Sequence, residues 1–168
     1  MKLSWSKYEL SKSYDEYITP KRTVRGHLRK IGNFFESLTF NDLQELDSAT
    51  KSAIKSMGIN FRVYSDEGSE ERTWPLDFIP RIIKKSEWNI VEKGLRQRTK
   101  ALNYFIEDCY NEQSFLNSGF INKSLITKSK YFLKFCKGTK LPNKSWAHIS
   151  GSDLIKDING DFHVLEDN

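Results

Sequence analysis

The sequence predicts an α+β fold, in which an N-terminal helical hairpin precedes a small, mostly antiparallel sheet backed by a long helix. Three features support this prediction: apolar residues at helical spacing in the first third of the chain, a long apolar helical stripe in its middle, and an Asn-Gly turn between two β-rich runs at its end. The 168 residues suit one domain, and the 13% of aromatic residues can supply its core.

Residues 22–57 are expected to form the helical hairpin. Apolar side chains recur at helical spacing over residues 23–38, which predicts the first helix. The second helix is expected to begin at Asn41, because Gln44 follows three residues later as in a capping box. Gly58 supplies the residue type at which helices commonly end.

Residues 58–168 are expected to form the α+β part of the chain. The alternation of residues 60–65 and their β-rich composition predict a strand. Residues 66–71 are polar and contain a glycine, as in a turn. Residues 73–79 are apolar but contain Pro75, so they are expected to form an edge strand or an extended segment.

The longest helix is expected over residues 86–111, with Ser86 as its N-cap and one continuous apolar stripe. A short helix is expected near residues 128–135. Strands are expected at residues 145–150 and within residues 153–168.

Charge and composition restrict the possible functions only loosely. The chain carries 27 basic and 22 acidic residues, which are interleaved and give a net charge of +5. An evenly charged surface is favoured over a nucleic-acid-binding one. No apolar stretch is long enough to span a membrane, and the N-terminus lacks an apolar leader, so we expect a cytoplasmic protein without a membrane partner.

Neither the cysteines nor the histidines indicate a zinc site. Cys109 and Cys136 lie far apart among apolar neighbours and are expected to be small buried side chains. The three histidines are not at ligand spacing. One basic cluster, comprising Arg96, Arg98 and Lys100, is either a solvated helix face or a contact surface for nucleic acid or an acidic partner.

The C-terminal residues are the most informative part of the sequence. The Asn159-Gly160 pair between two β-rich runs predicts a hairpin with a two-residue type I′ turn. That turn fixes the register, placing Ile155 opposite Val164 and Asp153 opposite Glu166. Residues that face each other across an antiparallel pair point to the same side of the sheet.

Asp153, Glu166 and Asn168 are therefore expected to converge at the open end of one hairpin face. Oxygen ligands of this kind suit Mg²⁺, and two facing carboxylates repel unless a cation lies between them. An alternative is that both acids simply point into solvent. An EF-hand loop with Gly160 at its sixth position is disfavoured, because Ile155 would occupy the first position and no exiting helix follows.

Several longer segments resemble the N-terminal part of the circularly permuted ATP-grasp type 2 family, long classed as a domain of unknown function. The resemblance runs nearly chain-wide, from about Tyr14 onward. Its most specific segments are residues 58–67, 71–81, 94–103, 148–154 and 165–168.

The resemblance implies an ATP- and Mg²⁺-dependent carboxylate–amine ligase. Such enzymes form an acyl phosphate from a carboxylate and ATP, and an amine then attacks it to give a peptide-type bond. It implies that Asp153, Glu166 and Asn168 are metal ligands, and it assigns no catalytic residue and no ATP-binding residue in this chain. Three arginines lie in matching segments without an assigned role: Arg62, Arg72 and Arg81.

Family members continue beyond the Glu-Asp-Asn motif into the half that holds the nucleotide, whereas this chain ends at Asn168. Residues 1–168 are therefore expected to be the N-terminal part of a circularly permuted ATP-grasp domain and to act as a fragment. We expect it to be inactive alone, with ATP, a carboxylate, an amine and the missing C-terminal half as its partners.

Overall fold

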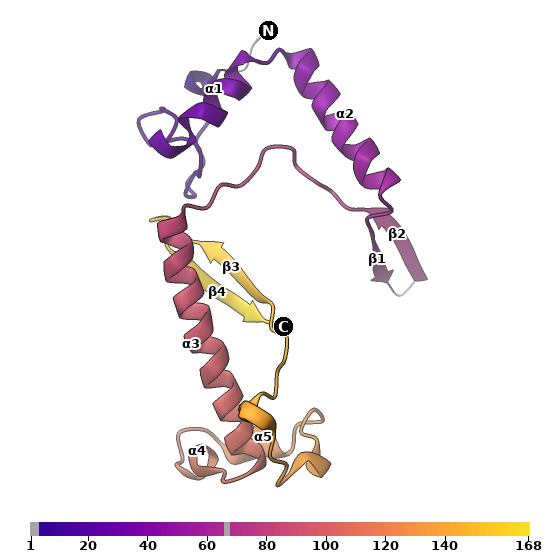
Figure 1. The fold of residues 1–168 in the computed structure, drawn as a ribbon, viewed down its shortest axis with the longest axis vertical. Coiled ribbons are helices and arrows are strands. Elements are labelled where there is room, and N and C mark those ends of the chain that lie inside the picture. The colour runs from indigo at the N-terminus through magenta and orange to yellow at the C-terminus, as the bar shows by residue number, and fades with distance from the viewer. Residues whose placement is uncertain (1–3, 66–67) are drawn as a thin grey trace. The chain divides into compact units, whose positions relative to one another are not determined.

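The structure is a computed structural model that describes residues 4–65 and 68–168. It divides into two compact units (Figure 1). The first unit contains the residues up to Ile82 together with Asp157–Gly160, and the second contains Ile83–Lys156 and Asp161–Asn168. Within the described residues, no helix combines the length and the apolar composition needed to cross a bilayer.

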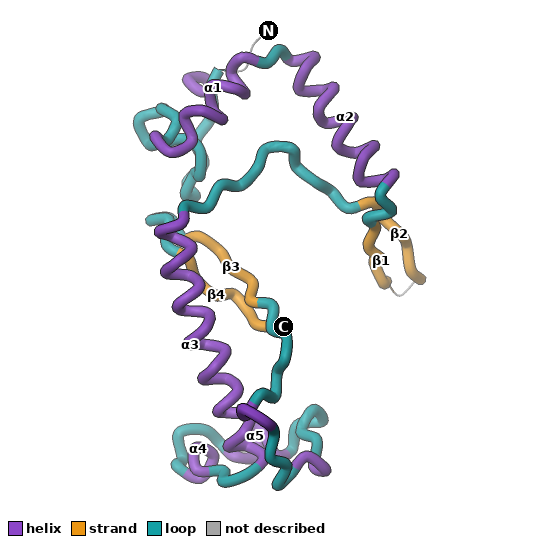
Figure 2. Tube along the Cα trace, viewed as in Figure 1, coloured by secondary structure: helices purple, strands orange, loops and turns teal. Residues whose placement is uncertain are grey.

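The predicted α+β class is confirmed. The antiparallel strands form two separate two-stranded sheets (Figure 2), one in each unit. The first sheet pairs β1 (Asn60–Ser65) with β2 (Gly68–Thr73), and the second pairs β3 (Ser152–Lys156) with β4 (Phe162–Asp167).

The first unit contains the two predicted consecutive helices, α1 (Arg29–Ser37) and α2 (Phe40–Ser56). Its core is a cluster of Trp5, Ile18 and Phe35, and the Trp5 indole N–H donates to the carbonyl of Gly32 on α1 at 3.1 Å. Two short 3₁₀ turns complete its helical elements, at Trp5–Lys7 and Gly26–Leu28.

The N-cap of α2 lies two residues earlier than predicted. Thr39, not Asn41, is the N-cap: its hydroxyl accepts the N–H of Asp42 at 3.2 Å, and the Asp42 carboxylate accepts the N–H of Thr39 at 2.7 Å. The Thr39 hydroxyl also donates to the Asp42 carboxylate at 2.7 Å, and the bonds that this carboxylate accepts from the Thr39 N–H and hydroxyl lower the pKa of Asp42. The prediction of Asn41 was wrong because Thr39 and Asp42 form the same reciprocal pair at the same spacing.

Replacing Thr39 by alanine is expected to destabilise the first unit by about 1 kcal/mol, because the N–H of Asp42 loses its acceptor. Thermal unfolding measures the loss. Asn41→Ala is the matched control, and we expect it to change stability by less than about 0.5 kcal/mol. Equal effects of the two substitutions would show that Thr39 is not the functional cap.

The strand over residues 60–65 is confirmed, and it pairs with a strand that was not predicted. Strand β2 occupies part of the predicted turn over residues 66–71, of which 66 and 67 lie outside the described residues. Of the predicted extended segment 73–79, only its first residue belongs to a strand. Every residue of β2 is exposed, so this strand lacks the apolar alternation from which it could have been predicted.

The second unit is organised along α3 (Lys85–Tyr110), which confirms the predicted long helix. The Glu87 carboxylate accepts the N–H of Lys84 at the start of this helix at 3.2 Å, so Ser86 is not the cap. Two short helices follow, α4 (Ser114–Asn117) and α5 (Lys123–Thr127), and two 3₁₀ turns, Lys134–Cys136 and Pro142–Lys144.

Two further predictions in this unit were wrong. The short helix expected near residues 128–135 lies about five residues earlier, where Asn122 caps α5 by accepting the N–H of Ser124 at 2.9 Å. Residues 145–150 form a loop and not a strand. The backbone N–H groups of Trp146 and Ala147 donate to the side-chain oxygen of Asn103, so they are not free to pair with another strand. Cys109 is buried as expected, and Cys136 is half-buried.

Candidate metal-binding hairpin

The turn between β3 and β4 is one residue longer than the predicted type I′ turn. The N–H of Gly160 bonds to the carbonyl of Asp157 at 3.0 Å, and Gly160 alone takes a positive φ, of +90°, whereas a type I′ turn requires Asn159 to do so as well. A Cβ at Gly160 would also meet the ring of Tyr14 at 2.6 Å, so two independent constraints favour glycine there.

The longer turn shifts the pairing of the strands by one residue. Ile155 lies opposite His163 and not opposite Val164, so that part of the predicted register was wrong. A β-bulge then inserts Leu165 into β4 and shifts the pairing back. Asp153 consequently lies opposite Glu166, as predicted, because two one-residue departures cancel.

The three predicted ligand residues lie on the exposed face at the end of this hairpin. Asp153, Glu166 and Asn168 are all exposed, and the Asn168 side-chain N–H donates to the Glu166 carboxylate at 3.4 Å. The backbones of Asn168 and Gly151 exchange two hydrogen bonds, of 2.6 and 2.7 Å, which keep the strand ends paired up to the last residue.

This donor set fits a hard divalent cation that retains several waters. It offers two carboxylates and one amide oxygen, the ligand types that Mg²⁺ takes from proteins. In the part of the chain that the structure describes, no three His, Cys, Asp or Glu side chains gather as a metal-binding group. A cation here would therefore depend on the Asp153–Glu166 pair together with Asn168 and water.

The opposite face of the same strand end carries a network that the sequence did not reveal. The Asp167 carboxylate accepts the Ser152 hydroxyl at 2.7 Å and the Arg98 side-chain N–H at 2.6 Å. These partners, Ser152 first and then Arg98, hold the pKa of Asp167 below its usual value. The sequence did contain one indication that Asp167 faces the opposite side. It lies between Glu166 and Asn168, which were expected to face outward, and alternate residues of a strand point to opposite faces.

A second charged contact joins the hairpin to the first turn of α3. The Lys156 side chain is only 9% exposed and lies 3.6 Å from the Glu87 carboxylate and 4.6 Å from the ring centre of Phe162. Burial alone would raise the pKa of Glu87. The N–H of Lys84 and the charge of Lys156 outweigh burial, so that the pKa is lowered. Together with Arg98, this contact attaches both ends of the hairpin to one helix.

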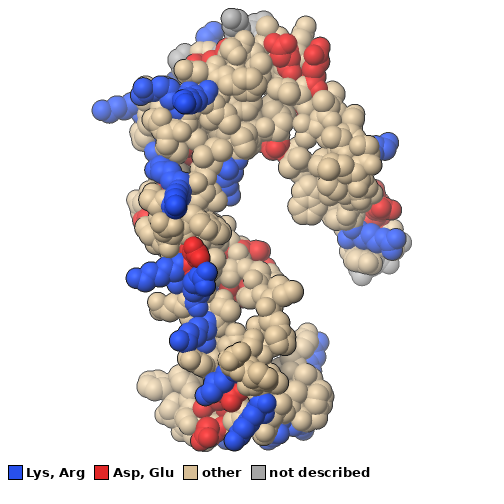
Figure 3. All heavy atoms as spheres, in the orientation of Figure 1, with Lys and Arg blue, Asp and Glu red and all other residues tan. Residues whose placement is uncertain are grey.

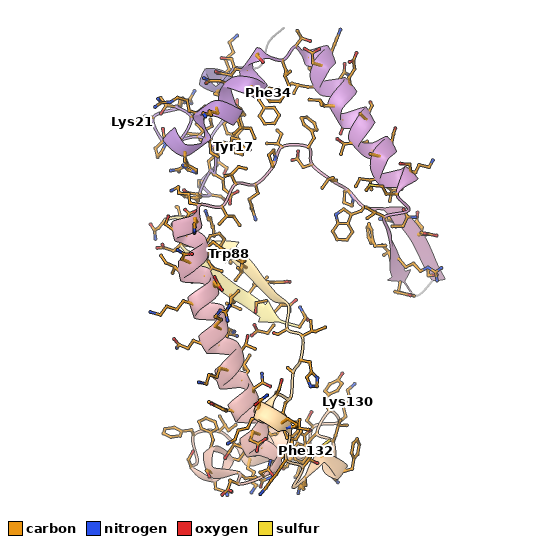
Figure 4. All side chains as sticks on the ribbon, viewed as in Figure 1. Tyr17, Lys21, Phe34, Trp88, Lys130 and Phe132 are labelled. Atoms are coloured by element: carbon orange, nitrogen blue, oxygen red, sulfur yellow. The ribbon has the colours of Figure 1, made fainter. Side chains whose placement is uncertain are left out.

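The segment that enters β3 is anchored to the C-terminal half of α3. The side-chain oxygen of Asn103 accepts the N–H groups of Trp146 and Ala147 at 2.6 and 2.9 Å. The Trp146 indole N–H donates to the Glu107 carboxylate at 2.7 Å. Its ring stacks on Tyr110, which in turn stacks on Phe132 (labelled in Figure 4), so the chain reaches β3 from a fixed point.

The basic cluster on α3 is largely neutralised. Basic side chains run along this helix with acidic ones among them (Figure 3). Arg96 pairs with Glu92 at 2.8 Å, and Arg98 with Asp167. Lys100 lies 5.6 Å from the ring centre of Tyr104. A solvated, internally paired helix face describes this cluster better than a contact surface for nucleic acid.

The arginines in the segments that resemble the ATP-grasp family lie in the first unit. Arg72 pairs with Glu70 and Arg81 with Glu16, each at 2.8 Å, and Arg62 is exposed on β1. The Arg72 contact is local and the Arg81 contact joins residues 65 positions apart, and neither assigns a ligand to these arginines.

Comparison with known proteins identifies the family. Residues 80–168, just over half of the chain, match the family described as circularly permuted ATP-grasp type 2. The chain belongs to this family. The matched residues include α3 and the whole β3–β4 hairpin, so the candidate site lies inside the part that defines membership of the circularly permuted ATP-grasp type 2 family.

Several bacterial proteins that the chain resembles are considerably longer than the chain itself. An uncharacterized protein of Synechocystis is 37% identical, and the aligned region covers 96% of this chain and 34% of the relative. An uncharacterized protein of Mycobacterium leprae is 36% identical, and the aligned region covers 94% of this chain and 28% of the relative. A Frankia alni protein with the provisional name glutamate–cysteine ligase 2-3 is 31% identical, and the aligned region covers 92% of this chain and 18% of the relative. The chain thus spans about a third or less of the length of these curated relatives.

Proposed function

We propose that this chain supplies the magnesium-binding hairpin of an ATP-dependent carboxylate–amine ligase, as the N-terminal part of a circularly permuted ATP-grasp domain. The observation that carries the proposal is the pairing of Asp153 with Glu166 on an exposed face, with Asn168 beside them. Membership of an ATP-grasp family supports the use of ATP and Mg²⁺.

In this proposal Asp153, Glu166 and Asn168 hold the cation, and none of them acts as nucleophile or base. Bound Mg²⁺ neutralises charge that develops on phosphoryl oxygens. The contribution of this chain is to place two carboxylates and an amide at one strand end and to keep them there through α3. The class of substrate, a carboxylate and an amine, is supported by the name of the Frankia relative.

The ligase activity is proposed for a protein of the relatives' length, and it is testable in a chimera in which this chain replaces the matching third of the Synechocystis relative. We expect Mg²⁺-dependent ADP release that requires both a carboxylate and an amine and is lost in Glu166→Gln. Turnover by the parent relative is the control. A chimera that keeps its full activity when it carries Glu166→Gln would contradict the proposed role of the hairpin.

The 168-residue chain by itself is expected to release no ADP above background. Three ligands on one strand end can hold a cation, but orienting ATP for phosphoryl transfer requires contacts along the whole nucleotide. The check is an ADP-release assay with purified chain, Mg²⁺ and a mixture of amino acids. Steady Mg²⁺-dependent release that disappears in Glu166→Gln would show that this prediction is wrong.

One observation favours a second candidate function, binding of a polyanion such as single-stranded RNA. Residues 113–152 contain seven lysines and no acidic residue, and within the described chain these lysines are all exposed and none forms a salt bridge. Exposed aromatic side chains, among them Phe120 and Tyr131, lie between them. A steep fall of RNA affinity with salt would support this function, and no measurable binding at low salt would exclude it.

A further inference from the structure

The anchoring of Asp167 has a consequence for the candidate cation site on the other face of the hairpin. We propose that Arg98 is a positioning residue for that site: through Asp167 it determines which side chains of β3 and β4 reach the exposed face. This inference rests on the proposed function. Arg98 itself is not a ligand: its side-chain N–H donates to Asp167 at 2.6 Å, and within the described residues no hydrogen bond or ion pair joins it to Asp153, Glu166 or Asn168.

The geometry follows from strand alternation. Ser152 lies opposite Asp167, and the next pair along the ladder is Asp153 opposite Glu166. Because successive residues of a strand point to opposite faces, holding Asp167 on the α3 side directs its neighbours Glu166 and Asn168 to the exposed side. The Ser152 hydroxyl bonds to the same carboxylate, so Asp153 is directed outward by the same anchor.

The register of this strand end is interrupted, so its pairing depends on contacts at the end itself: the two backbone bonds between Asn168 and Gly151, and the anchoring of Asp167. The bulge at Leu165 separates the last two pairs of the ladder from the regular pairs nearer the turn. A slip of one residue would exchange the faces of Glu166 and Asp167, as any one-residue slip does in a strand. Both residues are acidic, so charge alone does not select Glu166 as the outward residue, whereas the bond from Arg98 to Asp167 does.

A positioning role and a purely electrostatic role of Arg98 predict opposite changes in Mg²⁺ affinity when Arg98 is removed. Removing Arg98 deletes a positive charge near the site and leaves the Asp167 carboxylate without its guanidinium partner. On electrostatic grounds alone, both changes would strengthen Mg²⁺ binding. If Arg98 acts by position, its removal instead weakens Mg²⁺ binding. Partners that orient metal ligands typically change metal affinity 10- to 100-fold when they are removed.

The test is a Mg²⁺ titration of the 168-residue chain followed by NMR shifts of the amides around Asp153 and Glu166. We expect Arg98→Ala to bind Mg²⁺ about tenfold more weakly and Arg98→Lys to recover part of that loss. Arg96→Ala is the matched control, because Arg96 has the same charge on the same helix but pairs with Glu92. We expect this control to stay within about twofold of the parent chain.

A second readout needs no metal. Cross-strand NOEs between residues 152 and 167 report the register of the strand end, and we expect them to weaken in Arg98→Ala but not in Arg96→Ala. Arg98→Ala combined with Asp167→Asn should cost no more Mg²⁺ affinity than Asp167→Asn alone, because both remove one interaction.

Unchanged or tighter Mg²⁺ binding in Arg98→Ala, with an unchanged register, would overturn the positioning role and leave the proposed cation site intact. A parent chain whose hairpin signals do not respond to Mg²⁺ would overturn the proposed site and this inference together. The two failures are therefore distinguishable.

Discussion

Replacing Glu166 by glutamine is expected to weaken Mg²⁺ binding by the chain about 100-fold or more, beyond the loss typical of a residue that only orients a ligand. The substitution removes one of two facing carboxylates and keeps the size of the side chain. Without metal, Asp153 and Glu166 repel each other across the strands, so we expect stability to be unchanged or slightly higher, within about 1 kcal/mol. Calorimetric Mg²⁺ titration and thermal unfolding measure the two effects.

Glu112→Gln is the matched control, because it makes the same change at an exposed position outside the hairpin. We expect it to alter Mg²⁺ affinity less than twofold. A large loss of stability in Glu166→Gln would identify Glu166 as a structural residue. Equal affinities of Glu166→Gln and the parent chain would place the cation elsewhere.

Asn103→Ala is expected to destabilise the second unit by roughly 2 kcal/mol, the largest loss of stability we predict. The substitution leaves the N–H groups of Trp146 and Ala147 without their shared acceptor and releases the segment that enters β3. Thermal unfolding gives the magnitude, and hydrogen exchange of these two amides should accelerate.

Asn103→Asp is the informative control. An aspartate keeps an oxygen where both N–H groups donate and loses only the bond from the Asn103 side-chain N–H to the carbonyl of Thr99. We therefore expect less than half of the alanine loss. If alanine and aspartate cost the same, the anchor acts through Thr99 and not through the segment at Trp146.

Sequence patterns predicted the elements that carry strong local signals. The long apolar stripe predicted α3, and alternation predicted β1 with its bounds. The starts of the helices were predicted less well. Asn41 and Ser86 are acceptable caps by residue type, but the Asp42 and Glu87 carboxylates bond to the N–H groups of Thr39 and Lys84 instead.

At the candidate site, the pairing of Asp153 with Glu166 was predicted correctly, but the register between them and the turn was not. Asp153 and Glu166 were predicted to face each other from an assumed two-residue turn, and they do so through a longer turn compensated by a bulge at Leu165. A bulge leaves no short-range pattern in the sequence, so the intermediate register could not be predicted. The Arg98–Asp167 bond joins residues 69 positions apart, and tertiary contacts of this range have no local signal.

The most direct test of the central claim, one divalent cation site formed by Asp153, Glu166 and Asn168, is paramagnetic broadening by Mn²⁺. Trace Mn²⁺ is added to the isotope-labelled chain, and the loss of amide signals is mapped. We expect the broadening to centre on residues 152–153 and 165–168, to be reversed by excess Mg²⁺, and to be absent in Glu166→Gln. Broadening centred on another acidic region, or equally strong in Glu166→Gln, would contradict it.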